Sequence, residues 1–481
     1  MKKAATASII IAAIALAGCG EDETTTTNQV AICAADNTIG TECAGVPSGP
    51  LCSGSTCTDG ANCANVVTVA TDAEMQTALE QAQPGTCVAL QDGTYGNAVI
   101  PAGVSLLGRG PTNARVGAIQ AQGDGTMIKG VTSSGGGVQL GDGAQGVRIE
   151  AVRIENSGGD GVLVGVGSGV EIVRSEIVAS ARYGVSAFDS AGVNLVNTII
   201  SGNKGPGLWA ECVGGCECVA PNVPVSLINT IVRDNKIVGV SLVGADANFA
   251  SVDIRDQGVT ETTFAGGAGL SVSGCSNLQA KATRVLDNTD FGVLIDDSSA
   301  TLGLSGGDEG FEVSRNQIGL WIQNIGQSDA VQSVSISGGK ILTNSAVGIG
   351  LDGSSKGIII YGTEVRDTSL EVIPVLVGGV SAGAKEVGDG LNWLGLSHAT
   401  IDGLTVSGSA RQSVLIDGEV DSGSSIANVQ LEQGDELKGL LQQNLPSGGV
   451  QPTLGASTPQ LTVNMDELFA VPEEVGVPSS I

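Results

Sequence analysis

The sequence is poor in the residue types on which most catalytic and nucleic-acid-binding proteins depend. It has one histidine (His398) in 481 residues, and only 6 Phe, 3 Tyr and 3 Trp. A single histidine excludes metal sites built from several histidines and disfavours a Ser-His-Asp triad. Lys and Arg number 22 against 50 Asp and Glu, a formal charge of −28. The chain therefore lacks the basic surface that nucleic acids require, and its charge disfavours polyanionic ligands.

Glycine, by contrast, is plentiful. The chain has 73 glycines, roughly twice the average share. Hydrophobic residues make up 41% and charged residues 15%, which is the composition of a folded chain rather than a disordered one. So few large rings disfavour a conventional globular core of this size.

The N-terminus has the features of an export signal. Met1 to Lys3 is basic, and the apolar run from Ala4 to Ala17 is too short to span a bilayer. The run ends in Leu16-Ala17-Gly18-Cys19, which resembles a bacterial lipoprotein signal. The resemblance implies that residues 1–18 are removed and that Cys19 carries a lipid. An ordinary secretory signal with an incidental cysteine is the alternative.

Two consequences follow for the start of the mature chain. Residues 19–30 are acidic and rich in threonine, so we expect a flexible tether. We expect the protein to be anchored by its lipid in the bacterial cell envelope, on the outer membrane if the cell has two.

Ten cysteines remain when Cys19 is set aside. An even number in an exported chain predicts disulfides, although the sequence does not give their pairing. One group lies in or next to a Cys-rich segment spanning residues 31–65, and a second lies further along the chain: Cys33, Cys43, Cys52, Cys57, Cys63 and Cys87, then Cys212, Cys216, Cys218 and Cys275. A metal site at Cys212, Cys216 and Cys218 is the alternative for the second group.

A repeat of about 23 residues organises most of the chain. A glycine followed by an aliphatic residue recurs, with Ser413 replacing the glycine in one further unit, at Gly137, Gly161, Gly184, Gly207, Gly239, Gly269, Gly292, Gly319, Gly348 and Gly379. Two aliphatic residues five apart precede most of these glycines, so each unit holds about three short strands joined by tight turns. Such units predict an all-β fold, a single-stranded parallel solenoid.

This pattern resembles the right-handed parallel β-helix, or pectin-lyase-like, superfamily. The resemblance covers roughly residues 66–432 and implies the right-handed coil; we expect about 13 rungs. A helical pattern over residues 71–83 predicts a cap on the first rung. Residues 433–481 are expected to form a tail with a short amphipathic helix over Asp435–Asn444.

Two columns of side chains support the register. Asn203, Asn235, Asn288, Asn316 and Asn344 each lie three or four residues before a repeat glycine, which predicts a ladder of stacked asparagines. An outward column carries charges that alternate in sign over its last five members: Arg153, Glu176, Ile199, Ile231, Asp253, Arg284, Glu312, Lys340 and Glu364. We interpret it as cross-rung ion pairing; a lyase face, with carboxylates on calcium and an arginine base, is the alternative.

A second outward column contains two of the three tryptophans. Its members lie two residues after each repeat position: Leu163, Ser186, Trp209, Ser241, Ser271, Leu294, Trp321, Gly350, Ser381 and Leu415. Trp209 and Trp321 are candidates for stacking against neutral sugar rings. The alternative, which we favour, is that another part of the chain covers them, because large exposed apolar patches are uncommon.

A cluster of carboxylates is the candidate metal site. Asp287, Asp290, Asp296 and Asp297 lie close together in sequence and offer the hard oxygen ligands that Ca²⁺ prefers. No pair of carboxylates and no histidine-containing motif of the sugar-active relatives can be recognised, so no catalytic residue is assigned.

The sequence favours a non-catalytic binding or scaffold protein of the cell envelope, with neutral polysaccharide as the expected ligand. The alternative is a polysaccharide-active enzyme, a calcium-dependent lyase or an epimerase. A fold of this kind hosts many functions, so the fold does not decide between them.

Overall fold

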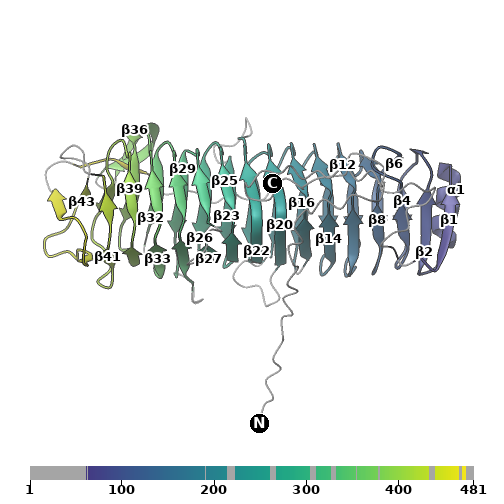
Figure 1. Ribbon diagram of the computed structural model, residues 1–481, viewed down its shortest axis with the longest axis horizontal. Helices are drawn as coiled ribbons and strands as arrows, with labels where there is room; N and C mark the ends of the chain where they lie inside the picture. The colour runs from purple at the N-terminus through teal and green to yellow at the C-terminus, as the bar shows by residue number, and fades with distance from the viewer. Residues whose placement is uncertain are drawn as a thin grey trace, which may run out of the picture.

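The protein is a long rod built by one chain that coils on itself (Figure 1). The computed structural model describes residues 61, 63–189, 191–213, 223–259, 267–303, 310–326, 332–353, 355–377, 380–432, 439–464 and 468–472. Cys19, the predicted signal peptide and the tether lie outside these residues. Within the described ranges, no helix has the length and apolarity needed to cross a membrane.

Each turn of the coil contributes three short strands, which stack on those of the next turn as parallel sheets. Faces 1 and 2 together form a 28-stranded sheet, and face 3 is a 15-stranded sheet. Face 1 consists of β1 (Asn65–Val69), β2 (Thr86–Leu90), β5 (Ser105–Leu107), β8 (Met127–Lys129), β11 (Val147–Glu150), β14 (Gly169–Val173), β17 (Gly192–Val196), β24 (Asn277–Lys281), β27 (Ser299–Leu302), β30 (Val334–Ser337), β33 (Ile358–Tyr361), β38 (Ala399–Asp402), β41 (Ser425–Ala427) and β44 (Thr453–Leu454). Two long strands bend across faces 1 and 2: β20 (Val223–Arg233) and β22 (Ala245–Arg255).

The other two faces complete each rung. Face 2 consists of β3 (Gly93–Thr94), β6 (Ala114–Val116), β9 (Thr132–Ser134), β12 (Arg153–Glu155), β15 (Glu176–Val178), β18 (Ile199–Ser201), β25 (Arg284–Leu286), β28 (Glu312–Ser314), β31 (Lys340–Leu342), β34 (Glu364–Arg366), β39 (Thr405–Ser407) and β42 (Gln430–Leu431). Face 3 consists of β4 (Ala98–Ile100), β7 (Ile119–Ala121), β10 (Val138–Leu140), β13 (Val162–Val164), β16 (Val185–Phe188), β19 (Leu208–Glu211), β21 (Val238–Val243), β23 (Ala268–Ser273), β26 (Phe291–Asp296), β29 (Ile318–Gln323), β32 (Val347–Asp352), β37 (Asp389–Leu394), β40 (Val414–Asp417), β43 (Leu440–Gln443) and β45 (Leu461–Asn464).

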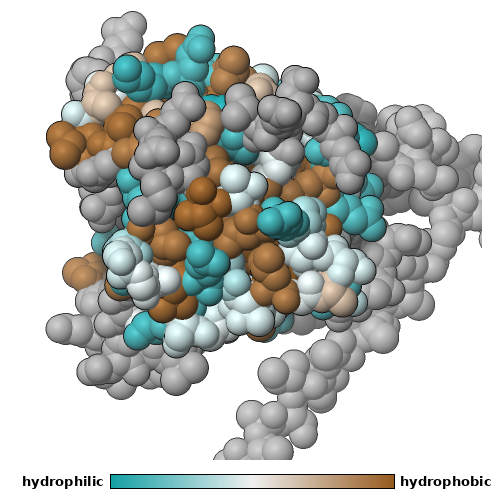
Figure 2. Space-filling view, turned by 90° about the vertical axis from the view of Figure 1, so that its left-hand side faces the viewer, coloured by the Kyte–Doolittle hydropathy of each residue, from teal (hydrophilic) through white to brown (hydrophobic). Residues whose placement is uncertain are grey.

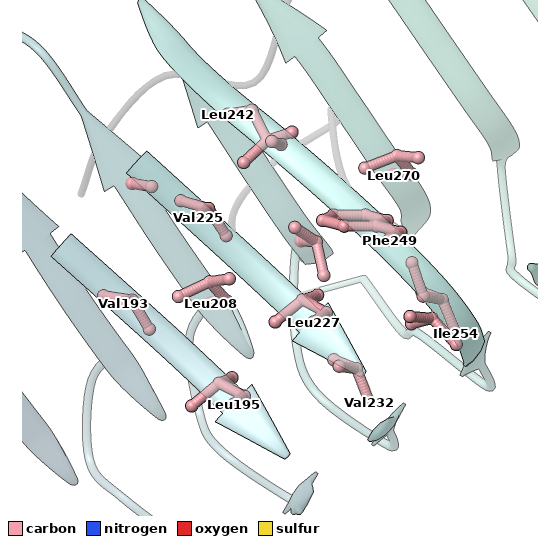
Figure 3. Close-up of a cluster of buried hydrophobic side chains, with 14 of the residues drawn as sticks. Val193, Leu195, Leu208, Val225, Leu227, Val232, Leu242, Phe249, Ile254 and Leu270 are labelled. Atoms are coloured by element: carbon pink, nitrogen blue, oxygen red, sulfur yellow. The ribbon is translucent and has the colours of Figure 1, made fainter. Parts of the chain in front are cut away.

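The interior is a narrow column of aliphatic side chains. Val193 and Leu227 from face 1, Ile254 from face 2 and Leu208 and Leu242 from face 3 point toward one another (Figure 3). Each rung stacks its aliphatic residues on those of its neighbours, so one cluster runs from Val69 to Leu440. This arrangement explains why a chain of this length needs so few aromatic residues.

Close packing of the backbone explains the repeated glycines. A Cβ added at Gly184 would lie 2.5 Å from the carbonyl oxygen of Gly207 on the next rung and 2.5 Å from Ile200 Cγ2. Because real Cβ atoms do not approach other atoms so closely, only glycine fits at this corner. The bend between faces 1 and 2 uses single left-handed residues instead, such as Ala151 at φ 50° and Asn197 at φ 52°.

The predicted asparagine ladder is confirmed. The side-chain amide of Asn203 donates to Asn235 Oδ1 at 2.7 Å, and that of Asn288 donates to Asn316 Oδ1 at 2.9 Å. Asn316 continues the ladder to Asn344 at 3.2 Å. Gln257, which the sequence pattern missed, fills the rung between the two halves, because its longer side chain still accepts from the backbone N–H of Asn235.

The two ends of the rod differ. Helix α1 (Asp72–Gln81) covers the N-terminal end, as predicted; Thr71 and Glu74 form a capping box at its start, and Met75 and Leu79 face the core. At the other end the coil continues past residue 432. Hydrophobic residues lie across this end face (Figure 2), and Leu454 and Val463 are exposed there.

The predicted C-terminal helix is wrong where the structure describes it. Residues 433–438 lie outside the described residues, but Leu440–Gln443 form strand β43, which pairs in parallel with β40. Leu440 packs into the interior and Leu441 packs outside face 3, so the segment alternates as a strand. The edge of β40 supplies backbone partners that the isolated pattern could not reveal, and this outweighs helix propensity.

Candidate functional site

The described structure contains a shallow trough on the outer side of face 1. It consists of two adjoining grooves that share Gly146 and Arg148, one of about 330 Å³ and one of about 500 Å³. The smaller groove is lined by Ala61, Gly85, Gly103, Ser105, Gly125, Thr126, Met127, Gly146 and Arg148. The larger is lined by Gly146, Val147, Arg148, Gly169, Val170, Glu171, Gly192, Val193, Asn194, Pro224, Val225, Ser226 and Asp246.

A column of glycines forms the floor of the trough. Parallel pairing places these residues opposite one another on six successive rungs: Gly85, Gly103, Gly125, Gly146, Gly169 and Gly192. Five strand spacings of ~4.8 Å give the floor a length of about 24 Å along the rod. The missing side chains leave a hollow that runs parallel to the long axis.

Backbone conformation requires glycine at only part of this floor. Gly85, Gly103, Gly125 and Gly146 have φ between 64° and 85°, in the left-handed region. Gly169 and Gly192 do not. A Cβ at Gly192 would make only an ordinary contact, 3.4 Å from Pro224 Cγ, whereas one at Gly169 would lie 2.9 Å from Gln145 Oε1, so the Gln145 side chain would have to shift. At these two rungs the backbone conformation does not require glycine. The effect of glycine there is to keep the trough open.

Polar side chains line one wall of the trough, two residues along each strand from the floor. Arg148, Glu171, Asn194 and Ser226 face outward on successive rungs. Arg148 donates to Glu171 and, at 2.9 Å, to Glu150 Oε2. The amide oxygen of Asn194 has no hydrogen-bond partner among the described residues. The wall thus carries polar side chains at regular intervals along the rod.

Buried charges hold Arg148 in place. Glu150 is almost completely buried and contacts three cations: Arg148, Arg174 at 2.6 Å and Lys129 at 3.6 Å. Burial alone raises the pKa of Glu150, but hydrogen bonds from Arg148 and Arg174 and the charge of Lys129 outweigh it and hold the pKa below its usual value. Glu150 therefore stays ionised and fixes the Arg148 guanidinium at the trough wall.

The carboxylates that line the trough are too far apart to form a hydrolytic pair. Glu171 on β14 and Asp246 on β22 are separated by three strand spacings, about 14 Å. Glycoside hydrolysis needs two carboxyl groups about 5–9.5 Å apart across the scissile bond. Glu171 and Asp246 therefore do not form a carboxylate pair of that spacing.

A family model described as the right handed beta helix region matches residues 117–266. These residues include the larger part of the trough, and the described strands stack as long parallel sheets. The protein is a right-handed parallel β-helix.

Among solved structures, the β-helix resembles the A-module of the mannuronan C-5 epimerase AlgE4 of Azotobacter vinelandii, with 14% identity, a TM-score of 0.34, and 82% of this chain and 95% of that chain covered. It also resembles the pectate lyase Pel9A, with 12% identity, a TM-score of 0.38, and 61% and 78% covered. An alginate lyase from Paenibacillus sp. str. FPU-7 shares 17% identity at a TM-score of 0.30, with 62% and 94% covered. No curated protein matches the sequence. This likeness concerns the coiled architecture alone.

The predicted calcium cluster is not assembled in the β-helix. Arg315 donates two hydrogen bonds of 2.6 Å to the Asp287 carboxylate. Asp296 accepts from the amide of Asn324 at 2.7 Å, while Asp297 accepts from Gln332 at 2.8 Å. Among the described residues no group of three or more His, Cys, Asp or Glu could hold a metal ion. Neighbours in sequence point to different partners here, which is why the prediction fails.

The fourth aspartate of that cluster has a different environment. Asp290 lies at the turn before β26, and burial raises the pKa of its carboxyl to about 7. It precedes a strand of face 3 and does not line the trough.

Trp209 and Trp321 lie on one outward column of face 3, as predicted, but both rings are covered. Their exposed fractions are 1% and 0%, so neither offers a face to a sugar in this structure. Trp209 donates to Glu211 at 2.8 Å, and Trp321 to Gln323 at 2.9 Å. The covering interpretation describes this column correctly.

An inserted hairpin provides part of the cover. Strands β35 (Glu371–Val377) and β36 (Val380–Val387) pair antiparallel, and β46 (Val471–Pro472) adds to β35 as a third strand. Ile373, Val375 and Val471 pack in one cluster with Trp321. The predicted column member Ser381 is wrong, because it lies on this hairpin; Asn392 takes its place opposite Gly350.

The predicted charge column has the expected register throughout. Arg153 pairs with Glu176, and Arg284 donates to Asp253 at 3.0 Å. The ion-pair interpretation is confirmed at these two places. The lone histidine also has a partner: His398 Nδ1 lies 2.8 Å from Asp421 Oδ1 on the next rung, at the partly exposed surface.

Some of the predicted disulfides can be checked. Cys63 and Cys87 are joined with an S–S distance of 1.95 Å, and Cys212 and Cys275 are each disulfide-bonded. The other predicted cysteines lie outside the described residues: Cys33, Cys43, Cys52, Cys57, Cys216 and Cys218.

The residues of the trough were missed by the sequence interpretation. The signal was present, because glycines recur at 85, 103, 125, 146, 169 and 192 with spacings close to the repeat. It was obscured by the stronger glycine-aliphatic repeat on face 3. Glycines that a turn requires and glycines that keep a surface open look the same in a sequence.

Proposed function

We propose that the trough binds an extended, uncharged polysaccharide chain, and that the protein is a non-catalytic glycan-binding protein of the bacterial cell envelope. The observation that carries this proposal is the open floor at Gly169 and Gly192, where backbone conformation does not require glycine and where, at Gly192, packing does not require it either.

The shape and chemistry of the trough support this ligand class. Its floor is straight and runs along the rod, which suits a linear polymer rather than a compact molecule. Sugar rings have flat apolar faces that can pack on a floor of peptide groups, and their hydroxyls can bond to Arg148, Glu171, Asn194 and Ser226. Wall groups repeat at every strand, as sugar hydroxyls repeat along a chain.

The charge balance supports a neutral ligand. The charged lining residues are Arg148, Glu171 and Asp246, one cation against two anions. The whole chain carries −28, so a polyanion would be repelled both over distance and at contact. The lipid at Cys19 remains part of the proposal, since it would hold the rod at a membrane that faces such polymers.

A second candidate is a polysaccharide-active enzyme, a lyase or an epimerase, the activities that the names of the solved structures mention. Arg148 favours it, because a fixed guanidinium facing the trough could neutralise a uronate carboxylate. The lack of a metal-binding group among the described residues disfavours the calcium-dependent form.

A pull-down on insoluble and immobilised polysaccharides tests the proposal. The panel holds neutral β-1,4-glucan, β-1,3-glucan and mannan, together with alginate and pectate. Gly192→Leu fills the trough, and Gly159→Leu is the matched control, because a Cβ at Gly159 meets nothing within 4 Å and that residue lies outside the trough.

We expect a neutral polymer to retain the wild type and the control but not Gly192→Leu. Equal retention of all three proteins would contradict the trough as the binding site. Incubation of alginate and pectate with added Ca²⁺ examines the second candidate; new unsaturated chain ends or inverted uronates would establish it in place of the first.

A further inference from the structure

We propose that the trough is closed at its N-terminal end by the Cys63–Cys87 disulfide and is open at the other end, so that it binds the terminal units of a polysaccharide chain rather than its interior. This inference rests on the proposed function and adds which part of the polymer is recognised.

The glycine floor ends at Gly85, because the preceding rung has an alanine in this column. Asn65 pairs with Thr86, so Ala64 lies opposite Gly85 in the next place of the column. The backbone N–H of Ala64 donates to the Gly85 carbonyl at 2.8 Å, and a Cβ built on Gly85 would lie 3.3 Å from the Ala64 methyl group. The first rung therefore carries a side chain where the following six carry none.

The disulfide lies at this end of the trough and links its floor side to its wall column. Cys63 precedes Ala64 and so lies on the floor side, whereas Cys87 lies two residues after Gly85, in the column that forms the wall. Their Cα atoms are 5.5 Å apart. A covalent link from floor to wall blocks any polymer that would continue along the groove.

Packing makes this end wall solid. Cys87 forms a small hydrophobic cluster with Leu107 and Met127, and Ala61 and Cys63 pack against it. Ala61 also lines the smaller groove, so it stands at the end of the trough rather than away from it. The end wall is therefore part of the folded rod.

At the opposite end, the described residues form no such barrier. The column continues from Gly192 to Pro224 on β20 and to Asp246 on β22, and the larger groove still includes both. Asp246 is exposed. A chain whose terminus rests against the disulfide can leave the trough over Pro224 and extend into solvent.

End-labelled oligosaccharides test this inference. Cellohexaose, laminarihexaose and mannohexaose are the probes, each unlabelled, with a bulky fluorophore at the reducing end, with one at the non-reducing end, or with both. We expect the wild type to bind a hexaose carrying one of the single labels nearly as well as the unlabelled sugar. The other single label and the double label should weaken binding by tenfold or more.

Joint replacement Cys63→Ser and Cys87→Ser opens the end wall. We expect this variant to recover binding of the double-labelled hexaose while its affinity for the unlabelled sugar stays within twofold. Thermal unfolding checks that the variant is folded, and the wild-type comparison of labels decides the question even where it is not.

The outcomes separate this inference from the function on which it rests. If the wild type binds unlabelled and double-labelled hexaoses equally, the trough is open at both ends and the inference is wrong, while glycan binding stands. If the wild type binds no unlabelled probe and no polymer of the pull-down panel, the proposed function fails and the inference falls with it.

Discussion

Removal of one ladder asparagine should destabilise the rod by more than its single side chain would suggest. Asn288 is buried; its Oδ1 accepts from the backbone N–H of Gln257 at 3.2 Å, and its Nδ2 donates to Asn316 at 2.9 Å. In Asn288→Ala the buried N–H of Gln257 loses its acceptor, at about 1–3 kcal/mol. The side-chain bond from Asn288 to Asn316 is also lost, which adds about 1 kcal/mol; Asn316 Oδ1 still accepts from the backbone N–H of residue 288. The total loss of stability is therefore about 2–4 kcal/mol.

Hydrogen exchange combined with chemical denaturation measures this effect. A repeat rod can open locally, so we expect the Gln257 amide to lose protection as well as a fall in the free energy of unfolding. Asn248→Ala is the matched control, because Asn248 is exposed on β22, and it should stay within about 0.5 kcal/mol of the wild type. Similar stability and Gln257 protection in both variants would refute the ladder as a source of stability.

Three further substitutions have definite expected results. Gly350→Ala places a Cβ 2.1 Å from the Trp321 ring, so the substitution should lower the free energy of unfolding by about 1–3 kcal/mol and shift the Trp321 fluorescence. Adding Trp321→Leu to the same chain should restore part of the lost stability, and no recovery would contradict the clash. Asp290→Asn tests the raised pKa of Asp290. Below about pH 4 the wild-type carboxyl is protonated in both the folded and the unfolded protein, and the stability that the raised pKa contributes is lost as the pH rises to about 7. The stability of the variant should therefore change less over that range, and an unchanged pH profile would contradict the burial. Asp389→Asn breaks the buried ion pair with Arg411, whose guanidinium also donates to the Ala470 carbonyl. This substitution should lower the free energy of unfolding by about 3–5 kcal/mol and make the segment around Ala470 more sensitive to protease. Protease resistance equal to that of the wild type would contradict this.

The repeat fold could be predicted from the sequence because equivalent positions on successive rungs have the same steric and hydrogen-bonding requirements. Gly184 must be glycine because the next rung passes within contact of its missing Cβ, and Asn288 must offer an amide to its neighbours. These demands recur with the period of the coil, so they are visible without any structure. The strand pairing of the charge column followed directly from that register.

Insertions and surfaces were harder to predict. Gly379 and Val380 imitate the repeat in the sequence, but Val380 begins strand β36 of the inserted hairpin. Only the pairing of Gly350 with Asn392 shows where the coil resumes. Leu440 and Leu441 fit a helix as well as a strand until the edge of β40 is known. Sequence neighbours such as Asp296 and Asp297 looked like a metal site because their separate partners arrive from other rungs.

The trough was beyond the sequence for a related reason. Gly169 and Gly192 could be recognised as unusual only once their φ angles and the space around them were known. Their meaning depends on stacking with Gly146 on the preceding rung and on the wall that Arg148 forms beside them.

Calorimetric titration with a length series of neutral oligosaccharides, from two to eight units, would show whether the trough binds a glycan. The affinity should rise with each added unit until the chain fills the floor of about 24 Å and then level off. Gly192→Leu should abolish the rise for the longer members and leave the stability of the protein unchanged, while Gly159→Leu should behave as the wild type. An affinity independent of length, or a length series unchanged by Gly192→Leu, would contradict the trough as a polysaccharide-binding site.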